Sequence, residues 1–208
     1  MDDLIGSIAN LDEENTLRLV KAKVSSGETS LEIIEQCREG VRIVGQRYAE
    51  ETYYLSDLIM SEEIMRGVIE ILEPYFPEIN SQEGAKIIIG TVEGDIHDIG
   101  KNIMINLLRS VGFQVYDLGV DVPPDAFIKA IIETDASIIG ISVLLSSSIN
   151  SVKKIIALVK KTGLRDKVTI VLGGYPVNER IREYTGADYC ENDAVKALEL
   201  FKHIFAKQ

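Results

Sequence analysis

Apolar residues recur every three or four positions along the first 75 residues, which is the spacing of one buried face of an α-helix. The stripes comprise Leu17, Val20 and Val24, then Leu31, Ile34, Cys37, Val41 and Val44, and then Leu58, Ile59, Ile64, Val68 and Leu72. Thr29 followed by Glu32 is a capping-box pattern that predicts a helix start, and Ser56 is predicted to cap the last of these helices. With the short segment 2–10, the pattern predicts about four helices in a small bundle.

The periodicity changes at residue 86, where short β-branched runs begin to alternate with helical stretches. Strands are predicted over 87–92, 114–118, 136–144, 168–172 and 187–190, and helices over 99–110, 124–134, 150–162, 179–185 and 194–206. Such alternation is typical of a doubly wound parallel sheet, and for five strands we expect the flavodoxin-like strand order. The predicted fold class is therefore α/β. An N-terminal helical bundle occupies residues 1–85, with its linker at about 75–85, and a five-stranded parallel sheet domain occupies residues 86–208.

Charge divides the chain at the same place. The 208 residues include 33 Asp and Glu against 22 Lys and Arg, a net charge of −11, and 46% hydrophobic residues, enough for a folded core. Residues 1–85 hold 18 acidic and 7 basic residues, whereas residues 86–208 hold 15 of each. An acidic segment beside a neutral one argues against nucleic acid as a partner, since phosphate binding needs a basic face.

Compartment and membrane association also follow from the composition. Two cysteines exclude a disulfide framework, and no basic segment with an apolar run at the start suggests a secretory signal. No apolar run reaches the roughly 18 residues that a membrane span needs. We therefore expect a cytoplasmic protein without a membrane partner.

The predicted sheet indicates where a ligand would bind, because open α/β sheets bind ligands beyond the carboxyl ends of their strands. Two of the loops at that edge are conspicuous: residues 93–100, with the sequence EGDIHDIG, and residues 173–176, with the sequence GGYP. A third loop carries the serine run 146–148. The glycine spacing after the first strand does not match a dinucleotide fingerprint, and no Gly-Lys-Ser/Thr phosphate loop occurs.

His97 is the candidate for metal chemistry in these loops. Neutral imidazole is a good ligand for transition metals, and a ligating histidine commonly donates its other N–H to a carboxylate such as Asp95. One histidine cannot build a free-ion zinc site, which needs about three or four protein ligands. A metal at His97 would therefore arrive with its other ligands supplied, as in a macrocycle. The alternative is that His97 only caps the following helix. His203, in the last helix, is interpreted as structural or surface.

Three sequence elements at this edge carry a family resemblance. The segment Asp95-Ile-His97-Asp98-Ile-Gly100 resembles the Asp-x-His-x-x-Gly signature of cobalamin (vitamin B12) binding domains. Ser142-Val-Leu144 resembles the Ser-x-Leu element of the same family, and the Gly173-Gly174 pair follows in family order. Residues 86–208 thus resemble the cobalamin module of methionine synthase and the corrinoid proteins of methylamine and methanol methyltransferase systems. The helical segment before them resembles the cap that precedes this domain in such proteins.

The resemblance implies a role for each residue. His97 would be the lower axial ligand of cobalt, in place of the cofactor's own base (base-off/His-on), and Asp95 and Ser148 would complete a His–Asp–Ser relay. Further cofactor contacts are implied for Gly94, Asp98, Gly100, Ser142, Leu144, Ser146, Gly173 and Gly174. The glycines would allow close approach of the nucleotide tail, and Ser142 would bond its base. In the cap, Tyr54, Leu58 and Met65 are the implied contacts.

The function implied is that of a methyl carrier. Cobalamin, as methylcobalamin, cob(I)alamin or hydroxocobalamin, would shuttle a methyl group from a substrate-specific methyltransferase to a second methyltransferase. The chain would be non-catalytic alone, and a separate reductive activator would restore inactive cobalt. Two alternatives are the cobalamin-binding small subunit of a radical mutase and a cobalamin-dependent sensor. The acidic cap disfavours the first. For the second, a DNA-binding domain is expected ahead of the cap, and the acidic charge balance disfavours DNA. The acidic cap itself is expected to steer partner proteins.

Overall fold

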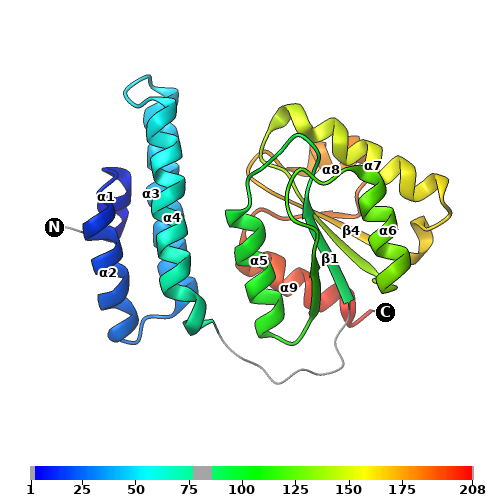
Figure 1. The fold of residues 1–208 in the computed structure, drawn as a ribbon, viewed down its shortest axis with the longest axis horizontal. Helices are drawn as coiled ribbons and strands as arrows, with labels where there is room; N and C mark the ends of the chain where they lie inside the picture. Colours follow the sequence, from blue (N-terminus) through cyan, green and yellow to red (C-terminus); the bar gives the residue numbers. More distant parts are fainter. Residues whose placement is uncertain (1–2, 77–85, 208) are drawn as a thin grey trace. The chain divides into compact units, whose positions relative to one another are not determined.

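The computed structural model describes residues 3–76 and 86–207 and divides the chain into two compact units, Met1–Phe76 and Pro77–Gln208 (Figure 1). The predicted linker from residue 77 to 85 lies outside the described residues. Within the described ranges, no helix combines the length and apolar character needed to cross a lipid bilayer.

The first unit contains the four predicted helices. They are α1 (Leu4–Ala9), α2 (Glu13–Ser25), α3 (Ser30–Ala49) and α4 (Leu55–Leu72), followed by the 3₁₀ turn η1 (Glu73–Tyr75). The capping box at the start of α3 is confirmed: the Glu32 amide donates to Thr29 Oγ1 at 3.3 Å, and the Thr29 amide donates to Glu32 Oε2 at 3.0 Å. The predicted stripes supply the core, which includes Val20, Ile34, Cys37, Val44, Ile64, Val68 and Leu72.

The start of α4 differs from the prediction. Ser56 was expected as the N-cap, and this is wrong, because the helix begins at Leu55 with Tyr54 in the capping position. The Asp57 carboxylate accepts a hydrogen bond from the Tyr54 amide at 2.7 Å. Since that bond satisfies an amide that the helix itself leaves without a partner, the helix starts two residues earlier.

The second unit is built on a five-stranded parallel sheet. Its strands are β1 (Lys86–Thr91), β2 (Gln114–Asp117), β3 (Ile138–Ser142), β4 (Thr169–Gly173) and β5 (Tyr189–Cys190). They lie in the order β2-β1-β3-β4-β5, with every pair parallel, which confirms the flavodoxin-like prediction. The register pairs Thr91 with Ser142 and Ser142 with Gly173, so the ends of the three central strands lie side by side.

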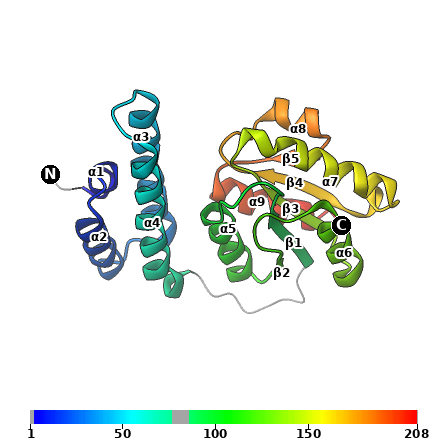
Figure 2. The same cartoon turned by 45° about the horizontal axis from the view of Figure 1, so that its top comes forward.

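Helices cover both faces of this sheet, which explains why the central strands β1, β3 and β4 are mostly apolar and buried. On one face lie α5 (Ile99–Ser110) and α9 (Ala194–Phe205) (Figures 1 and 2). On the other lie α6 (Pro124–Thr134), α7 (Ile149–Lys161) and α8 (Glu179–Thr185), with short 3₁₀ turns η2 (Ser146–Ser148) and η3 (Arg165–Lys167). All five predicted helices are present within one residue of their expected bounds.

Candidate functional site

The loop between β1 and α5 carries His97 along the carboxyl edge of the sheet. Two local bonds shape it: the Thr91 hydroxyl donates to the His97 carbonyl at 3.0 Å, and the His97 amide donates to Asp95 Oδ1 at 3.2 Å. Asp98 takes the N-cap position of α5, and its Oδ2 accepts a hydrogen bond from the Asn102 side chain at 3.2 Å. The helix start and the histidine therefore come from one short, hydrogen-bonded turn.

The His97 ring is held by a buried carboxylate. Its Nδ1 lies 2.7 Å from Asp95 Oδ1, and Asp95 is fully buried, while the His97 side chain is 35% exposed. An ionised carboxylate only accepts hydrogen bonds, so Nδ1 carries the ring proton and Nε2 keeps its lone pair. Nε2 is therefore the ring atom that can bind a metal.

The Asp95 carboxylate is also held from the β3–α7 loop. Its Oδ2 accepts hydrogen bonds from the backbone amides of Leu144 at 2.6 Å and Leu145 at 2.9 Å. Burial by itself would raise the pKa of Asp95, but these amides and the two donors of His97 lower it below its ordinary value. Asp95 therefore stays ionised at neutral pH and keeps the His97 ring in one orientation.

Ser148 contacts the same loop, but not at the expected atom. Its buried hydroxyl donates to the Gly94 carbonyl at 3.0 Å rather than to the Asp95 carboxylate that a His–Asp–Ser relay would use. Ser148 is also the N-cap of α7 by position, yet its side chain makes no capping bond there. The hydroxyl therefore links two loops of the edge. Ser146 is exposed in the turn η2.

The candidate glycines fall into two groups. Gly174 has φ +126°, and a Cβ there would lie 1.9 Å from the Val143 carbonyl oxygen, so the fold itself requires glycine. Gly94 likewise has a left-handed φ of +83°. By contrast, a Cβ at Gly173 would make only an ordinary 3.5 Å contact, and one at Gly100 would meet nothing within 4 Å. The folded chain alone gives no reason for glycine at these last two positions.

Apolar side chains are also exposed in the loops at this edge of the sheet. They come from four loops and are Ile96, Val120, Leu144, Leu145 and Tyr175; Ile96 is 70% exposed and Tyr175 is 82% exposed. Ser142 lies half-buried at the end of β3, where its carbonyl accepts a hydrogen bond from the Val92 amide at 3.1 Å. An exposed apolar rim at the edge that also carries His97 is the kind of surface that suits a large, flat, apolar ligand bringing its own metal.

The cap candidates are distributed over the surface and core of the helical unit. Tyr54 is exposed and Leu58 is half-buried, whereas Met65 is buried in the bundle core. The exposed apolar surface at the start of α4 also includes Leu55 and Met60, which were not among the implied cofactor contacts, and Ile59, which was predicted in the buried stripe but is 56% exposed. Helical periodicity did not separate them from the core, because the apolar stripe there is wider than one face.

Asp121 was also missed by the sequence reasoning. It follows β2 at the same edge, its Oδ1 accepts a hydrogen bond from the Gly94 amide at 2.7 Å, and its amide donates to the Asp95 carbonyl at 2.9 Å. The available signal was an acidic residue in a loop at the ligand-binding edge. The contact with Gly94, 27 residues earlier, could not be inferred from spacing.

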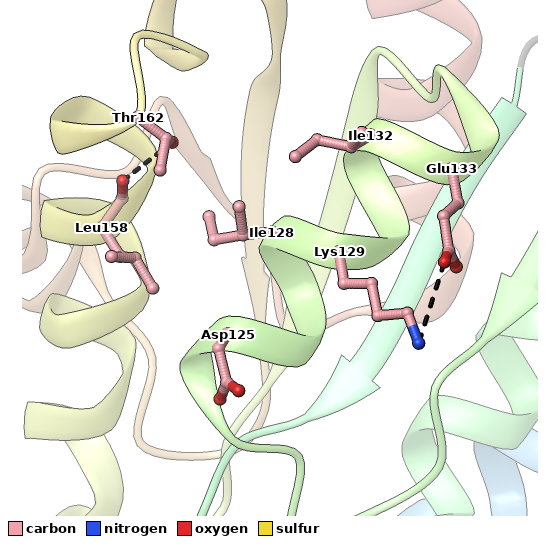
Figure 3. A pocket seen from close by; sticks show the side chains of 7 residues that line it. All are labelled: Asp125, Ile128, Lys129, Ile132, Glu133, Leu158 and Thr162. Carbon is pink, nitrogen blue, oxygen red and sulfur yellow. Dashed lines mark hydrogen bonds and ion pairs between the residues drawn. The ribbon is translucent and has the colours of Figure 1, made fainter.

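A shallow groove of about 440 Å³ lies elsewhere, between α6 and α7 (Figure 3). Ile128, Ile132 and Leu158 form its apolar wall, and an ion pair of 3.7 Å joins Lys129 to Glu133 at its side. None of the candidate site residues lines this groove. The Asp95–His97 pair therefore lies at the carboxyl edge of the sheet and not in the groove.

Comparison with known proteins identifies the family of both units. Two family profiles, both described as B12 binding domain, match residues 85–201 and residues 1–73. The dimethylamine corrinoid protein of Methanosarcina barkeri is 35% identical over 208 residues, which cover 99% of this chain and 97% of that protein.

Solved structures show the same architecture. The Methanosarcina barkeri monomethylamine corrinoid protein has a TM-score of 0.91 and 30% identity, covering 97% of this chain and 96% of that chain. A chain of the methanol:cobalamin methyltransferase complex from the same organism shares the fold, with a TM-score of 0.57 and 24% identity over 99% of this chain and 79% of that chain. The chain therefore belongs to the cobalamin-binding corrinoid proteins of the methyltransferase type.

Proposed function

We propose that this protein is a methyl carrier that binds cobalamin in the base-off form with His97 Nε2 as the lower cobalt ligand. The observation that carries the proposal is the 2.7 Å contact between His97 Nδ1 and the buried Asp95 carboxylate. This contact fixes the proton on Nδ1 and leaves Nε2 as the donor atom. Carboxylate partners of this kind orient a ligating histidine and raise its basicity.

The residues around His97 fit such a ligand. The apolar rim, with Ile96 and Tyr175 among its exposed members, offers a surface to a corrin ring. Gly100 and Gly173 leave space that a side chain would fill, and this supports a tail approaching the backbone there. Ser142, half-buried and paired with Gly173 in the register of the sheet, is the proposed partner of the displaced base.

Cobalamin, when bound, supplies a cobalt centre able to carry a methyl group. The chain's part is to hold His97 in its ligating orientation, which Asp95 does through Nδ1 and which the Leu144 and Leu145 amides secure by holding Asp95. The exposed apolar start of α4, including Tyr54 and the half-buried Leu58, is proposed to shield the upper face of the cofactor from water.

The proposed partners are a substrate-specific methyltransferase and a second, acceptor methyltransferase. Support comes from the relatives, two of which are named for methylated amines, and from the solved methyltransferase complex that contains a chain of this fold. A reductive activator is proposed as a third partner. The net charge of −11 falls on residues 1–85, so steering by the acidic helical unit would make transfer rates depend on ionic strength.

The experiment that tests the ligand is electron paramagnetic resonance of the protein loaded with cob(II)alamin. Nuclear spin of an axial nitrogen splits the cobalt lines, and protein labelled with ¹⁵N-histidine changes that splitting only if histidine is coordinated. His97→Ala should abolish the histidine-dependent pattern, whereas His203→Ala, an exposed position on α9, should keep it. If the labelled wild-type protein shows the same splitting as the unlabelled protein, the assignment of His97 as the ligand is overturned.

A further inference from the structure

The Gly94 peptide, directly before Asp95, is held from two other loops at once. Its amide donates to Asp121 Oδ1 at 2.7 Å, from the loop after β2. Its carbonyl accepts from Ser148 Oγ at 3.0 Å, from the turn before α7. Gly94 itself has a left-handed φ of +83°, so this peptide takes a conformation that the chain does not hold by local preference alone.

Asp121 holds this peptide through two bonds that run in opposite directions. Besides accepting from Gly94, it donates its own amide to the Asp95 carbonyl at 2.9 Å. Together the two bonds hold the peptide plane before Gly94 and the peptide plane after Asp95. Any tilt of these planes would move the Asp95 carboxylate and with it the His97 ring.

The backbone of Asp121 supports a dedicated role. Its φ is +52°, a left-handed conformation that only glycine adopts readily and that Asp and Asn tolerate better than other residues. In this conformation Asp121 presents its amide and its carboxylate to the same loop.

We propose that Asp121 is a positioning residue for the axial ligand, which orders the Gly94–Asp95 segment so that His97 can stay coordinated to cobalt. This inference rests on the proposed function of His97. Asp121 acts through backbone groups and does not itself touch the cofactor. Outer residues that orient a metal ligand typically change metal affinity by about 10- to 100-fold when they are removed.

The test compares three variants of the full chain. Asp121→Gly removes the carboxylate and relaxes the left-handed backbone, whereas Asp121→Asn keeps an acceptor oxygen and tolerates the same φ. Asp135→Gly is the matched control, because Asp135 has an almost identical φ of +56° but sits at the C-cap of α6. Thermal unfolding of each apoprotein checks that all three fold.

Two readouts follow the proposed chain of contacts. Hydrogen exchange of the Gly94 amide, measured by NMR on the apoprotein, should become at least about tenfold faster in Asp121→Gly, because its acceptor is gone. In the loaded protein, Asp121→Gly should lose part of its ¹⁵N-histidine coupling and release cobalamin about tenfold faster, at the lower end of outer-residue effects. Asp121→Asn and Asp135→Gly should stay close to the wild type.

The outcomes separate this inference from the function on which it rests. If the wild-type protein lacks histidine coupling, the proposed function fails, whatever Asp121 does to the Gly94 amide. If the wild type has that coupling and Asp121→Gly keeps it with unchanged cobalamin release, the positioning role is overturned. The role is equally overturned if Asp121→Asn is as impaired as Asp121→Gly, since the acceptor oxygen would then not be the cause.

Discussion

The adjacent glycines at the end of β4 offer a sharp test of which residues serve the fold and which serve the ligand. Gly174→Ala places a methyl group at a position whose nearest atom is the Val143 carbonyl oxygen, 1.9 Å away. Gly173→Ala adds the same methyl group one residue earlier, where the nearest atom is the Glu191 carbonyl oxygen at 3.5 Å. The two variants thus add the same methyl group, but only the one at Gly174 clashes with a neighbouring atom.

The expected magnitudes follow from these contacts. At Gly174 the backbone would have to separate by about 1 Å to reach the 3.0 Å below which Cβ contacts essentially never occur, and the clashing neighbour Val143 is fully buried in densely packed surroundings that resist such a shift. The φ of +126° adds a backbone cost of about 1–3 kcal/mol for alanine. Val143 is itself tied to β4, since its amide donates to the Gly173 carbonyl at 3.0 Å. We expect a loss on the order of 4 kcal/mol in the free energy of unfolding.

Gly173→Ala should behave in the opposite way. Because its contact is ordinary and its φ lies outside the left-handed region, alanine should leave the apoprotein unchanged or stabilise it by about 0.4–1 kcal/mol through the unfolded state. Its proposed cost is in cobalamin binding, where the methyl group would occupy space left for the tail. The variant is therefore a test of ligand binding without loss of fold.

The assay combines urea unfolding of the full-length apoprotein with hydrogen exchange of peptides that cover 138–145 and 169–175. Gly174→Ala should speed exchange in both peptides, and Gly173→Ala should not. Equal stability of the two variants would refute the reasoning from the contact distances. Unchanged cobalamin affinity in Gly173→Ala would remove this glycine from the proposed tail site.

Three further predictions concern buried ionisable groups. Lys101 is buried and its Nζ lies 2.7 Å from Asp117 Oδ1, whose side chain is 35% exposed. Asp117→Ala leaves the buried ammonium without this partner and should lower the free energy of unfolding in urea by about 3 kcal/mol. Lys101→Met leaves a carboxylate that water reaches and should lower it by only about 1 kcal/mol. Equal losses in the two variants would contradict this difference between the buried and the exposed partner.

Burial raises the pKa of the Cys37 thiol to about 12, whereas Cys190 is only half-buried. After alkylation of the native protein at neutral pH, mass spectrometry should therefore find Cys190 modified before Cys37. In denaturant both cysteines should be modified. The pKa of Asp95 is lowered on folding, so its carboxylate contributes stability above the ordinary pKa of 3.8, and this contribution is lost as pH falls through the folded pKa. The Tm difference between wild type and Asp95→Asn should therefore shrink below about pH 4. A Tm difference that stays constant with pH would argue against this linkage.

Much of the fold could be predicted because its signals are local. The helices of the second unit begin and end within one residue of their predicted bounds, since Pro124 and the apolar periodicities act over a few residues. The N-cap of α4 was wrongly predicted at Ser56, because both Ser56 and the neighbouring Asp57 are residue types that favour a helix start. The hydrogen bond from the Tyr54 amide to the Asp57 carboxylate determines where the helix begins. The exposed and buried members of the wide apolar stripe, such as Ile59 and Met65, could not be separated without packing.

The sequence by itself determined the α/β class, through its alternating strands and helices, and the pairing of Asp95 with His97, because that pair is two residues apart and its turn is local. The strand order was expected only as the one typical of five-stranded units, and the structure confirms it. Only the tertiary structure decided what holds the pair. The amides of Leu144 and Leu145 reach Asp95 across 49 and 50 residues, and the Ser148 hydroxyl turns to Gly94 across 54. The physical reason is that contacts between loops depend on the register of β1 against β3 and on the path of each loop, which long-range packing sets and no local pattern encodes.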